Sequence, residues 1–323
     1  MKNISVVIPN YNGVGLLRAY LPSVFRAIVQ AGVEGEVIIV DDCSTDESVE
    51  FIKRDYPQVN LLINEKNLGF GCTCNRGFEM AQHDVVLCLN NDMELRGDFL
   101  SQQLHLMERE DVFAVMSRIM SGDGNQVLES CKRLKRDLLG FKIHNIPDEN
   151  WEGDVAHSLF ACGGNALYDR KKLLLLSGYS PLLFPFYMED VDLSLRAWRM
   201  GWKSLYCKST ECYHQHSATI ASIHSKHNID RASYLNYLKM VYLQSDPKMR
   251  RRMIAKVALK MFVYAFQAAF STKKRMRISV FFSFFSFISK ANHTFGGEGL
   301  SYQFSLHEVL QHLQLHSPVG DAQ

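Results

Sequence analysis

Short runs of β-forming residues alternate with amphipathic segments through the first third of the chain. The predicted buried strands cover residues 4–8, 36–40, 59–63 and 85–89, and the predicted helices between them cover residues 16–31, 44–55 and 74–81. Strands that are separated by helices pair in parallel through right-handed crossovers. We therefore predict an α/β fold with a mostly parallel central sheet flanked by helices.

Two of the predicted strands end in acidic residues. Asp41 follows the 36–40 strand, and Asn90, Asn91 and Asp92 follow the 85–89 strand. The carboxyl ends of parallel strands form the edge at which open α/β sheets bind ligands, and a carboxylate there can hold a divalent cation against a diphosphate. An ordinary strand-to-loop turn explains these residues equally well when the stretch is considered alone, because Asn and Asp favour turns.

A dinucleotide-binding Rossmann domain is a second interpretation of this region. Gly69 and Gly71 precede a predicted helix, and Asp92 follows after about 20 residues, as that fingerprint requires. However, Cys74 occupies the third glycine position, and residues 9–13 fill the first strand-to-helix turn with the unrelated sequence Pro-Asn-Tyr-Asn-Gly. These departures make an oxidoreductase the weaker interpretation.

The middle of the chain contains two features that the sequence leaves open. After a predicted helix at 99–110 and a predicted strand at 112–116, residues 121–154 are polar, irregular and mixed in charge. This segment is either an acceptor-facing flap or an ordinary surface loop. Gly163 and Gly164 lie between apolar runs, where they permit a close backbone approach or form a β-bulge.

Three acidic residues, Glu189, Asp190 and Asp192, lie in the first turn of a further predicted helix. They fit the positive end of the helix dipole, which is a structural role. Alternatively, one of them is a general base whose pKa is shifted by its neighbours. Arg196 can pair with Asp192 four residues earlier, and this pairing leaves Asp190 as the candidate base.

Two histidines, His214 and His216, follow a predicted short strand at 204–207 and its loop. Strand alternation would place both side chains on one face. They are either metal ligands beside the predicted carboxylate site or ordinary core and surface histidines.

Taken in order, these stretches resemble the inverting family 2 glycosyltransferases, which have the GT-A (nucleotide-diphospho-sugar transferase) fold. The matching stretches are residues 5–12, 39–46, 67–71 with Asn75, 89–92, 163–166, 189–193 and His214, across about residues 1–220. The pattern looks most like the bacterial branch that includes rhamnosyltransferases. The resemblance implies a glycosyltransferase that moves a sugar, with inversion, from a nucleotide-diphosphate donor to a hydroxyl of a lipid-linked or polysaccharide acceptor.

The resemblance also implies residue roles. Tyr11 would stack on the base of the donor and Asp41 would hydrogen-bond it. Asp92 and His214, with His216 as the rival ligand, would bind Mg²⁺ or Mn²⁺, and Asp190 would be the catalytic base. The remaining donor-site candidates are Pro9, Asn12, Asn67, Gly69, Asn75, Asn90 and Asn91, and the acceptor-side candidates are Gly163, Gly164, Glu189, Asp192 and Trp198.

The chain departs from the family pattern at the metal-binding triplet. Where the family has a D-x-D-like sequence, this chain has Asn90-Asn91-Asp92 and keeps a single carboxylate. A non-catalytic GT-A-like domain that binds nucleotide or glycan is therefore the alternative to an enzyme.

The C-terminal part has a different composition, which divides the chain into a catalytic domain at 1–246 and a helical appendage at 247–323. Within the catalytic domain, we expect a nucleotide-sugar half at about 1–118 and an acceptor half at about 119–246. Between Pro247 and Gly297 there are eleven Lys and Arg residues and no acidic residue. The uncharged runs in this segment are shorter than the roughly 20 residues that span a bilayer.

Two interpretations of the appendage stay open. Residues 247–290 form either a basic amphipathic segment on an anionic membrane surface or a helical hairpin that packs on the catalytic domain or on a second copy in a homodimer. Nucleic-acid binding is not favoured, because no recognised motif accompanies the charge. The eight cysteines contain no C-x-x-C pair, and the N-terminus enters a strand at once. We therefore expect a cytoplasmic protein, peripheral on the inner face of the cell membrane.

Overall fold

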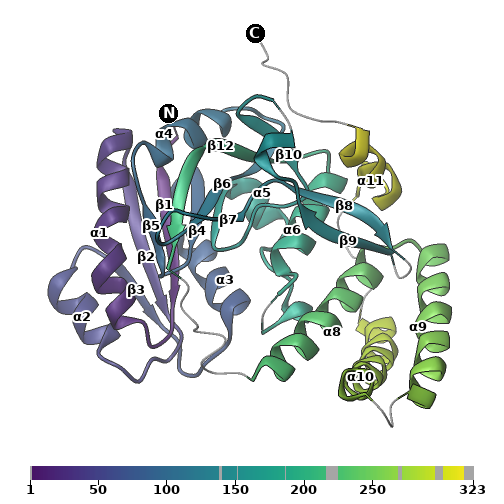
Figure 1. Cartoon of the computed structure of the whole chain (residues 1–323). Coiled ribbons are helices and arrows are strands. Elements are labelled where there is room, and N and C mark those ends of the chain that lie inside the picture. Colours follow the sequence, from purple (N-terminus) through teal and green to yellow (C-terminus); the bar gives the residue numbers. More distant parts are fainter. Residues whose placement is uncertain are drawn as a thin grey trace.

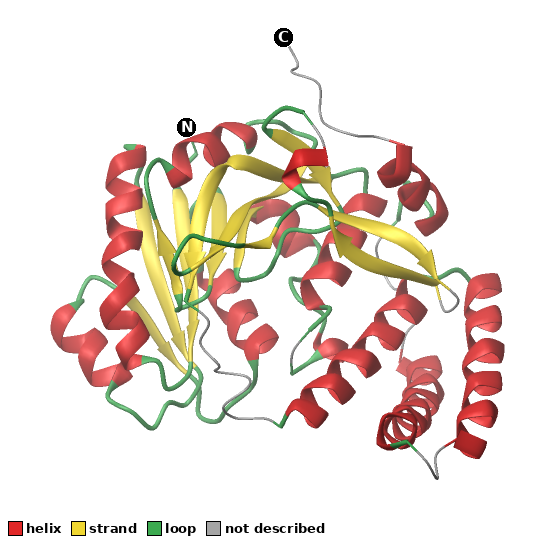
Figure 2. Cartoon of the chain, in the orientation of Figure 1, coloured by secondary structure: helices red, strands yellow, loops and turns green. Residues whose placement is uncertain are grey.

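The computed structural model describes residues 2–137, 140–150, 152–185, 187–215, 225–267, 271–294 and 301–315. A central sheet has helices on both faces, and a group of C-terminal helices lies at one end of the molecule (Figures 1 and 2). The strands are β1 (Ile4–Asn10), β2 (Gly35–Asp41), β3 (Asn60–Ile63), β4 (Val85–Leu89), β5 (Met93–Leu95), β6 (Val112–Ser121), β7 (Val127–Glu129), β8 (Lys132–Asp137), β9 (Gly140–Asn145), β10 (Val155–Ser158), β11 (Asn165–Asp169) and β12 (Lys203–His214). The helices are α1 (Val14–Ala31), α2 (Ser48–Asp55), α3 (Phe70–Met80), α4 (Phe99–Leu106), α5 (Arg170–Leu175), α6 (Glu189–Arg199), α8 (Lys226–Gln244), α9 (Pro247–Gln267), α10 (Thr272–Thr294) and α11 (Leu306–Leu315), with short 3-10 turns η1 (Asp148–Asn150) and η2 (Pro181–Leu183).

The central sheet combines a parallel half with a mixed half. Its main strand order is β10-β12-β6-β11-β4-β1-β2-β3, and β5 and β7 pair with β12 and β6. Strands β4, β1, β2 and β3 are parallel, as the alternation of strands and helices predicts. Strand β11 runs antiparallel to both β4 and β6, and β12 is parallel to β6. The α/β prediction is confirmed, and the parallel part brings the ends of β1, β2 and β4 to one edge.

Strand β4 shows how the apolar pattern builds the core on both faces of the sheet. All five of its residues are buried. Val85, Leu87 and Leu89 pack in the cluster that includes α1 and α4, whereas Val86 and Cys88 pack in the cluster that includes α3. Because successive strand side chains point to opposite faces, a continuous apolar run is what a strand covered on both sides requires.

The segment at 121–154 is not irregular, so that prediction is wrong. It contains β7, which pairs with β6, and the antiparallel β8–β9 hairpin, which forms a separate two-stranded sheet. The charged sequence of β8 lacks the apolar alternation by which a half-buried strand is recognised, and its backbone pairs with β9 instead of the central sheet.

Strand β12 is longer than the predicted strand at 204–207, and the predicted loop after it is wrong. The strand continues to His214 and changes its register against β6 between Cys207 and Glu211. The polar residues at 208–211 suggest a loop from sequence, but an irregularity in the ladder accommodates them. His214 therefore lies on a strand of the central sheet, opposite Met93 of β5.

Helices α9 and α10 pack against each other, and α10 packs on α8, which is the packing on the 1–246 part that the hairpin interpretation expects. Their buried side chains, including Met253, Val257, Phe281 and Phe284, join one cluster with Leu238 of α8. Within the ranges given above, no helix combines the length and apolar character needed to cross a bilayer.

Candidate active site

A chain of hydrogen bonds joins the ends of β1, β2 and β4. The Asp41 carboxylate accepts from Asn10 Nδ2 at 2.8 Å, from the Ser44 backbone N–H at 2.8 Å and from Ser44 Oγ at 2.7 Å. Asn10 Oδ1 in turn accepts from Asn91 Nδ2 at 2.8 Å. Asp41 and Asn10 are fully buried. Asp41 therefore orders the strand ends through protein contacts, and Asn91 takes part in the same network. Asn10 is a member that the sequence analysis missed.

Gly13 allows the next loop to cross this network. A Cβ atom at this position would lie 2.3 Å from Asn91 Nδ2 and 2.5 Å from Asn10 Oδ1. The loop is also tied to the loop after β2, because the Asn12 backbone N–H donates to Ser44 Oγ and Asn12 Oδ1 accepts from the Thr45 backbone N–H. Pro9 at the end of β1 and the half-buried Tyr11 are thereby held beside the strand ends.

Asp42 fixes the third loop at this edge. It accepts from Asn64 Nδ2 at 2.7 Å, from the Leu68 backbone N–H at 2.8 Å and from the Gly69 backbone N–H at 2.9 Å. The same loop carries Asn67, whose side chain is exposed. Asn67 and Gly69 are candidates from the sequence, whereas the buried Asp42 carboxylate that shapes their loop is not among them.

Asn75 faces the protein backbone. Its Nδ2 donates to the Tyr179 carbonyl, and its Oδ1 accepts from the Tyr179 N–H, both at 2.8 Å. This amide pair fastens α3 to the segment that leads toward α6.

Asp92 and His214 form the candidate metal pair. The Asp92 Oδ2 and His214 Nε2 atoms are 3.0 Å apart. This contact is a direct hydrogen bond or ion pair. A cation could replace it and be bound by both side chains, because two adjacent ligands of an octahedral Mg²⁺, each about 2.1 Å from the ion, lie about 3.0 Å from one another. In the described ranges, no group of three or more His, Cys, Asp or Glu residues is arranged to hold a metal. Further ligands would therefore come from substrate and water. His216 lies outside the described residues.

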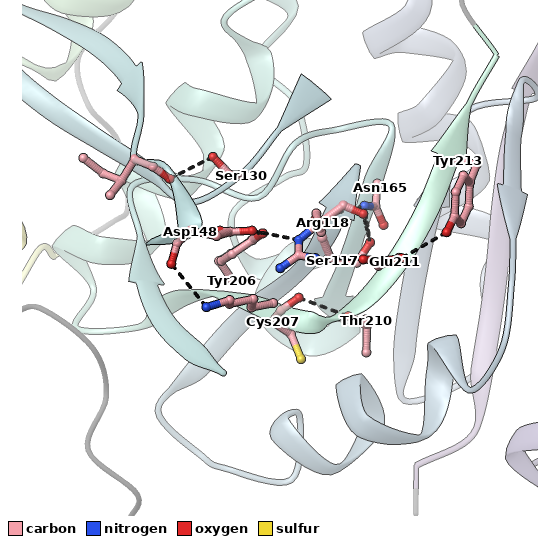
Figure 3. Close-up of polar contacts among 12 residues, drawn as sticks. Ser117, Arg118, Ser130, Asp148, Asn165, Tyr206, Cys207, Thr210, Glu211 and Tyr213 are labelled. Carbon is pink, nitrogen blue, oxygen red and sulfur yellow. Dashed lines mark hydrogen bonds and ion pairs between the residues drawn. The ribbon is translucent and has the colours of Figure 1, made fainter. Parts of the chain in front are cut away.

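A polar network fixes the part of β12 that leads to His214 (Figure 3). Arg118 of β6 pairs with Asp148 at 2.7 Å and with Glu211 of β12 at 2.8 Å. The Tyr206 hydroxyl donates to Asp148, and the Tyr213 hydroxyl donates to Glu211 at 3.0 Å. These contacts connect the η1 turn to β12 on either side of its irregular segment.

Asp190 lies half-buried in the first turn of α6, next to the buried Glu189. One of its oxygens accepts from the Gly163 N–H at 3.0 Å and the other accepts from the Val191 N–H at 2.8 Å. Burial raises the pKa of Asp190, and these N–H groups and the charge of Lys132 oppose the rise. Burial, and then the charge of Asp190, raise the pKa of Glu189 well above its usual range. Both shifts favour the protonated forms, and the shift is stronger for Glu189, whose charged form is disfavoured by burial and by the neighbouring Asp190.

The Gly163–Gly164 turn connects the candidate base to the candidate metal pair. Gly163 contacts Asp190, and the carbonyl of Gly164 accepts from the backbone N–H of Asn90 at 3.0 Å. A Cβ atom on Gly164 would lie 2.5 Å from the Asn90 side-chain nitrogen, so the close approach needs glycine. The Gly163–Gly164 turn thus contacts both the first turn of α6, through Asp190, and the end of β4 that leads to Asp92, through Asn90.

Asp192 and Trp198 hold α6 in place. Asp192 accepts from Arg196 Nε at 2.9 Å, as the spacing of the two residues predicts, and from Gln244 Nε2 of α8 at 2.7 Å. Trp198 Nε1 donates to the carbonyls of Ser158 and Leu159. Both side chains are buried, and these contacts give them a positioning role for the helix that carries Asp190.

A mixed sheet with loops gathered at one edge, together with the carboxylate–imidazole pair and the half-buried Asp190, matches a GT-A transferase fold. The structure superposes on GalNAc-T7, solved with UDP, GalNAc and Mn²⁺, with a TM-score of 0.61 and 18% identity, covering 91% of this chain and 58% of that one. The chain belongs to glycosyl transferase family 2, whose family model matches residues 5–174. The oxidoreductase interpretation is therefore dropped, and the rhamnosyltransferase-like branch stays a prediction.

Two relatives illustrate the range of the family. The amylovoran biosynthesis glycosyltransferase AmsB of Erwinia amylovora is 29% identical over 215 residues, which cover 63% of this chain and 67% of that protein. An undecaprenyl-phosphate 4-deoxy-4-formamido-L-arabinose transferase of Pseudomonas syringae is 32% identical over 118 residues, which cover 34% of each protein. The chain thus spans about a third of the length of the second relative.

Proposed function

We propose that this chain is an inverting, metal-dependent hexosyltransferase. It moves a sugar from a nucleotide-diphosphate donor to a hydroxyl of a lipid-linked or polysaccharide acceptor, in the synthesis of a cell-surface glycan at the inner face of the cell membrane. Family membership and the names of the two relatives, which refer to amylovoran and to undecaprenyl phosphate, support these substrate classes. The observation that best supports the proposal is the hydrogen bond from Gly163 to Asp190. The neighbouring Gly164 accepts from Asn90, at the strand end that leads to Asp92, so the candidate base and the candidate metal ligand are tied to the same two glycines.

The donor binds at the edge formed by β1, β2 and β4. Tyr11 stacks on the base, and the loop fixed by Asp42 contributes Asn67 and Gly69. Asp92 and His214 would hold Mg²⁺ or Mn²⁺, which would neutralise the charge of the diphosphate leaving group. The Mn²⁺ and UDP named in the GalNAc-T7 structure support a divalent metal and a nucleotide-sugar donor in general.

Asp190 takes the proton of the acceptor hydroxyl. The Gly163 and Val191 N–H groups hold the carboxylate in one orientation while it does so. The acceptor oxygen then bonds to the anomeric carbon as the bond from that carbon to the diphosphate breaks, and the nucleoside diphosphate leaves with the bonding electrons. A single displacement from the face opposite the leaving group inverts the anomeric configuration.

The test compares two isosteric variants of the acidic pair. Asp190→Asn removes the base and should lower kcat by about 10²- to 10⁴-fold, while nucleotide binding measured by calorimetry persists. Glu189→Gln replaces a carboxyl whose charged form is disfavoured by burial and by Asp190, so it should retain most of the transfer activity. A panel of nucleotide sugars with Mg²⁺ or Mn²⁺ supplies the assay. Normal turnover by Asp190→Asn would place the base elsewhere.

The same assay addresses the non-catalytic alternative. The single carboxylate in Asn90-Asn91-Asp92 is the feature that favours a binding domain. If the unaltered protein binds a nucleotide sugar but neither transfers nor hydrolyses it with any panel member, the binding domain is the better description.

A further inference from the structure

Helix α9 exposes a stripe of large apolar side chains. Leu259, Phe262, Val263 and Phe266 are exposed by 65%, 64%, 43% and 72%. Their spacing places them on one face of the helix. The opposite face contains the buried side chains of the helix, and these pack in the cluster formed with α8 and α10. The exposed stripe therefore adds nothing to the core of the described structure.

Cations flank this stripe. Lys248, Arg251, Arg252 and Lys256 are exposed on the earlier turns of α9, and helical spacing places them on the outward half of the helix that also carries the stripe. On α10, beyond the far end of the stripe, Lys273 and Arg275 are exposed as well. Because the sequence from 247 to 297 contains no acidic residue, no carboxylate of this segment neutralises these charges. We define the four apolar residues and the six cations together as the α9 surface.

The chemistry of the α9 surface matches an anionic bilayer. Apolar side chains on a helix insert into the boundary between headgroups and acyl chains, and Lys and Arg around them attract anionic headgroups. A second copy that bound through the same surface in a two-fold dimer would bring the two sets of cations together, which is unfavourable. Figure 1 shows α9 at the outer edge of the molecule, farther from the central sheet than α8, where a flat surface can reach it.

Helix α8 connects this surface to the candidate site. Asn236 Nδ2 donates to the Leu183 carbonyl at 2.6 Å, and Lys239 Nζ donates to the Leu182 carbonyl at 3.0 Å, both in the segment before Asp190. Gln244 of the same helix donates to Asp192. The donor-side helices α1 and α2 lie at the opposite end of the molecule (Figure 1).

We propose that the α9 surface docks on the anionic leaflet of a membrane and thereby holds the acceptor half of the protein toward that leaflet. The orientation toward a lipid-linked acceptor rests on the proposed function, whereas the docking itself does not.

The experiment is cosedimentation of the full chain with phosphatidylcholine vesicles, with and without phosphatidylglycerol. The unaltered protein should bind the anionic vesicles and dissociate as salt is added. The double variant Phe262→Ser/Phe266→Ser should bind at least about tenfold more weakly, since each inserted Phe contributes strongly to partitioning. The control is Val29→Ser, which removes an apolar side chain that is 79% exposed on α1, and its binding should be unchanged.

Several outcomes would overturn the proposal: no binding of the unaltered protein to anionic vesicles, equal binding by the double variant, or a dimer that the double variant disrupts without any vesicle binding. The last outcome would assign the surface to a second copy. Thermal unfolding and donor hydrolysis of the double variant, both expected to match the unaltered protein, separate docking from folding and catalysis. Vesicle binding requires no turnover, so failure of the proposed function leaves this test intact.

Discussion

Replacing Asp42 by Asn tests whether one buried carboxylate shapes the donor edge. The side chain is 4% exposed and accepts three hydrogen bonds from the loop at 64–69. One oxygen, Oδ1, accepts from both Asn64 and Leu68, and the other, Oδ2, accepts from Gly69. The substitution keeps the shape of the side chain and removes its charge and one of its two acceptors.

The magnitude follows from these contacts. An amide oxygen at the Oδ1 position keeps two hydrogen bonds, which become neutral and lose about 1 kcal/mol each. The amide nitrogen at the Oδ2 position faces the Gly69 N–H, donor against donor, and this lost bond costs about 1.5–3 kcal/mol. The sum is about 4 kcal/mol, which corresponds to a lowering of Tm by about 8 °C at about 2 °C per kcal/mol.

Calorimetry measures the change in Tm, and initial rates measure the kinetic effect. Because the loosened loop carries Asn67 and Gly69, we expect the KM for the donor to rise more than kcat falls. The control is Asp55→Asn, which removes an exposed carboxylate beside Arg54 and should change Tm by no more than about 1 °C. If Asp42→Asn lowers Tm by less than about 2 °C and leaves KM unchanged, the Asp42 carboxylate does not shape the donor edge.

Two further predictions concern pH. The charge of Lys132 lowers the pKa of Asp190, so Lys132→Met should raise that pKa and move the acidic limb of the kcat/KM profile to higher pH; an unmoved limb would count against this electrostatic effect. Burial first, and then the charges of Lys203, His312, Arg133 and Arg109, lower the pKa of His157 to about 4. Between about pH 6.5 and pH 4, His157 is protonated in the unfolded chain but stays neutral in the folded protein. At pH 5 this difference lowers the free energy of unfolding by about 2 kcal/mol. His157→Phe should reduce the difference in Tm between pH 7 and pH 5, and an unchanged difference would contradict the assignment.

The sequence predicts the features that depend on local order in the chain. Apolar runs that alternate with helices are enough to predict the parallel strands and to place Asp41 and Asp92 at strand ends on one edge. The pairing of Asp192 with Arg196 follows from their spacing on a helix, and the structure contains it. In each case the partners are near in sequence, or the regular geometry of a strand or helix fixes their positions.

The contacts that complete the site join residues that are far apart in the sequence, and no periodic pattern indicates them. Asn10 and Asn91 are 81 residues apart, and Asn75 and Tyr179 are 104 residues apart. The β8–β9 hairpin was missed for a related reason, since its strands pair with each other and need no apolar face. The pattern of apolar residues indicates which side chains are buried, but it contains no information about which polar groups meet.

The three acidic residues at the start of α6 differ in their hydrogen-bond partners. Asp192 has a guanidinium and an amide as partners, so its charge is balanced and its position is fixed. Glu189 is buried beside another acid, and burial and then the charge of Asp190 raise its pKa well above the usual range. Asp190 accepts one backbone N–H on each oxygen, and a carboxylate has about four acceptor positions. Each oxygen of Asp190 thus keeps capacity for a further hydrogen bond, which a base needs in order to receive the proton of an acceptor hydroxyl. The spacing of Asp192 and Arg196 already favours Asp190 in the sequence, and the contacts of the three residues agree with that prediction.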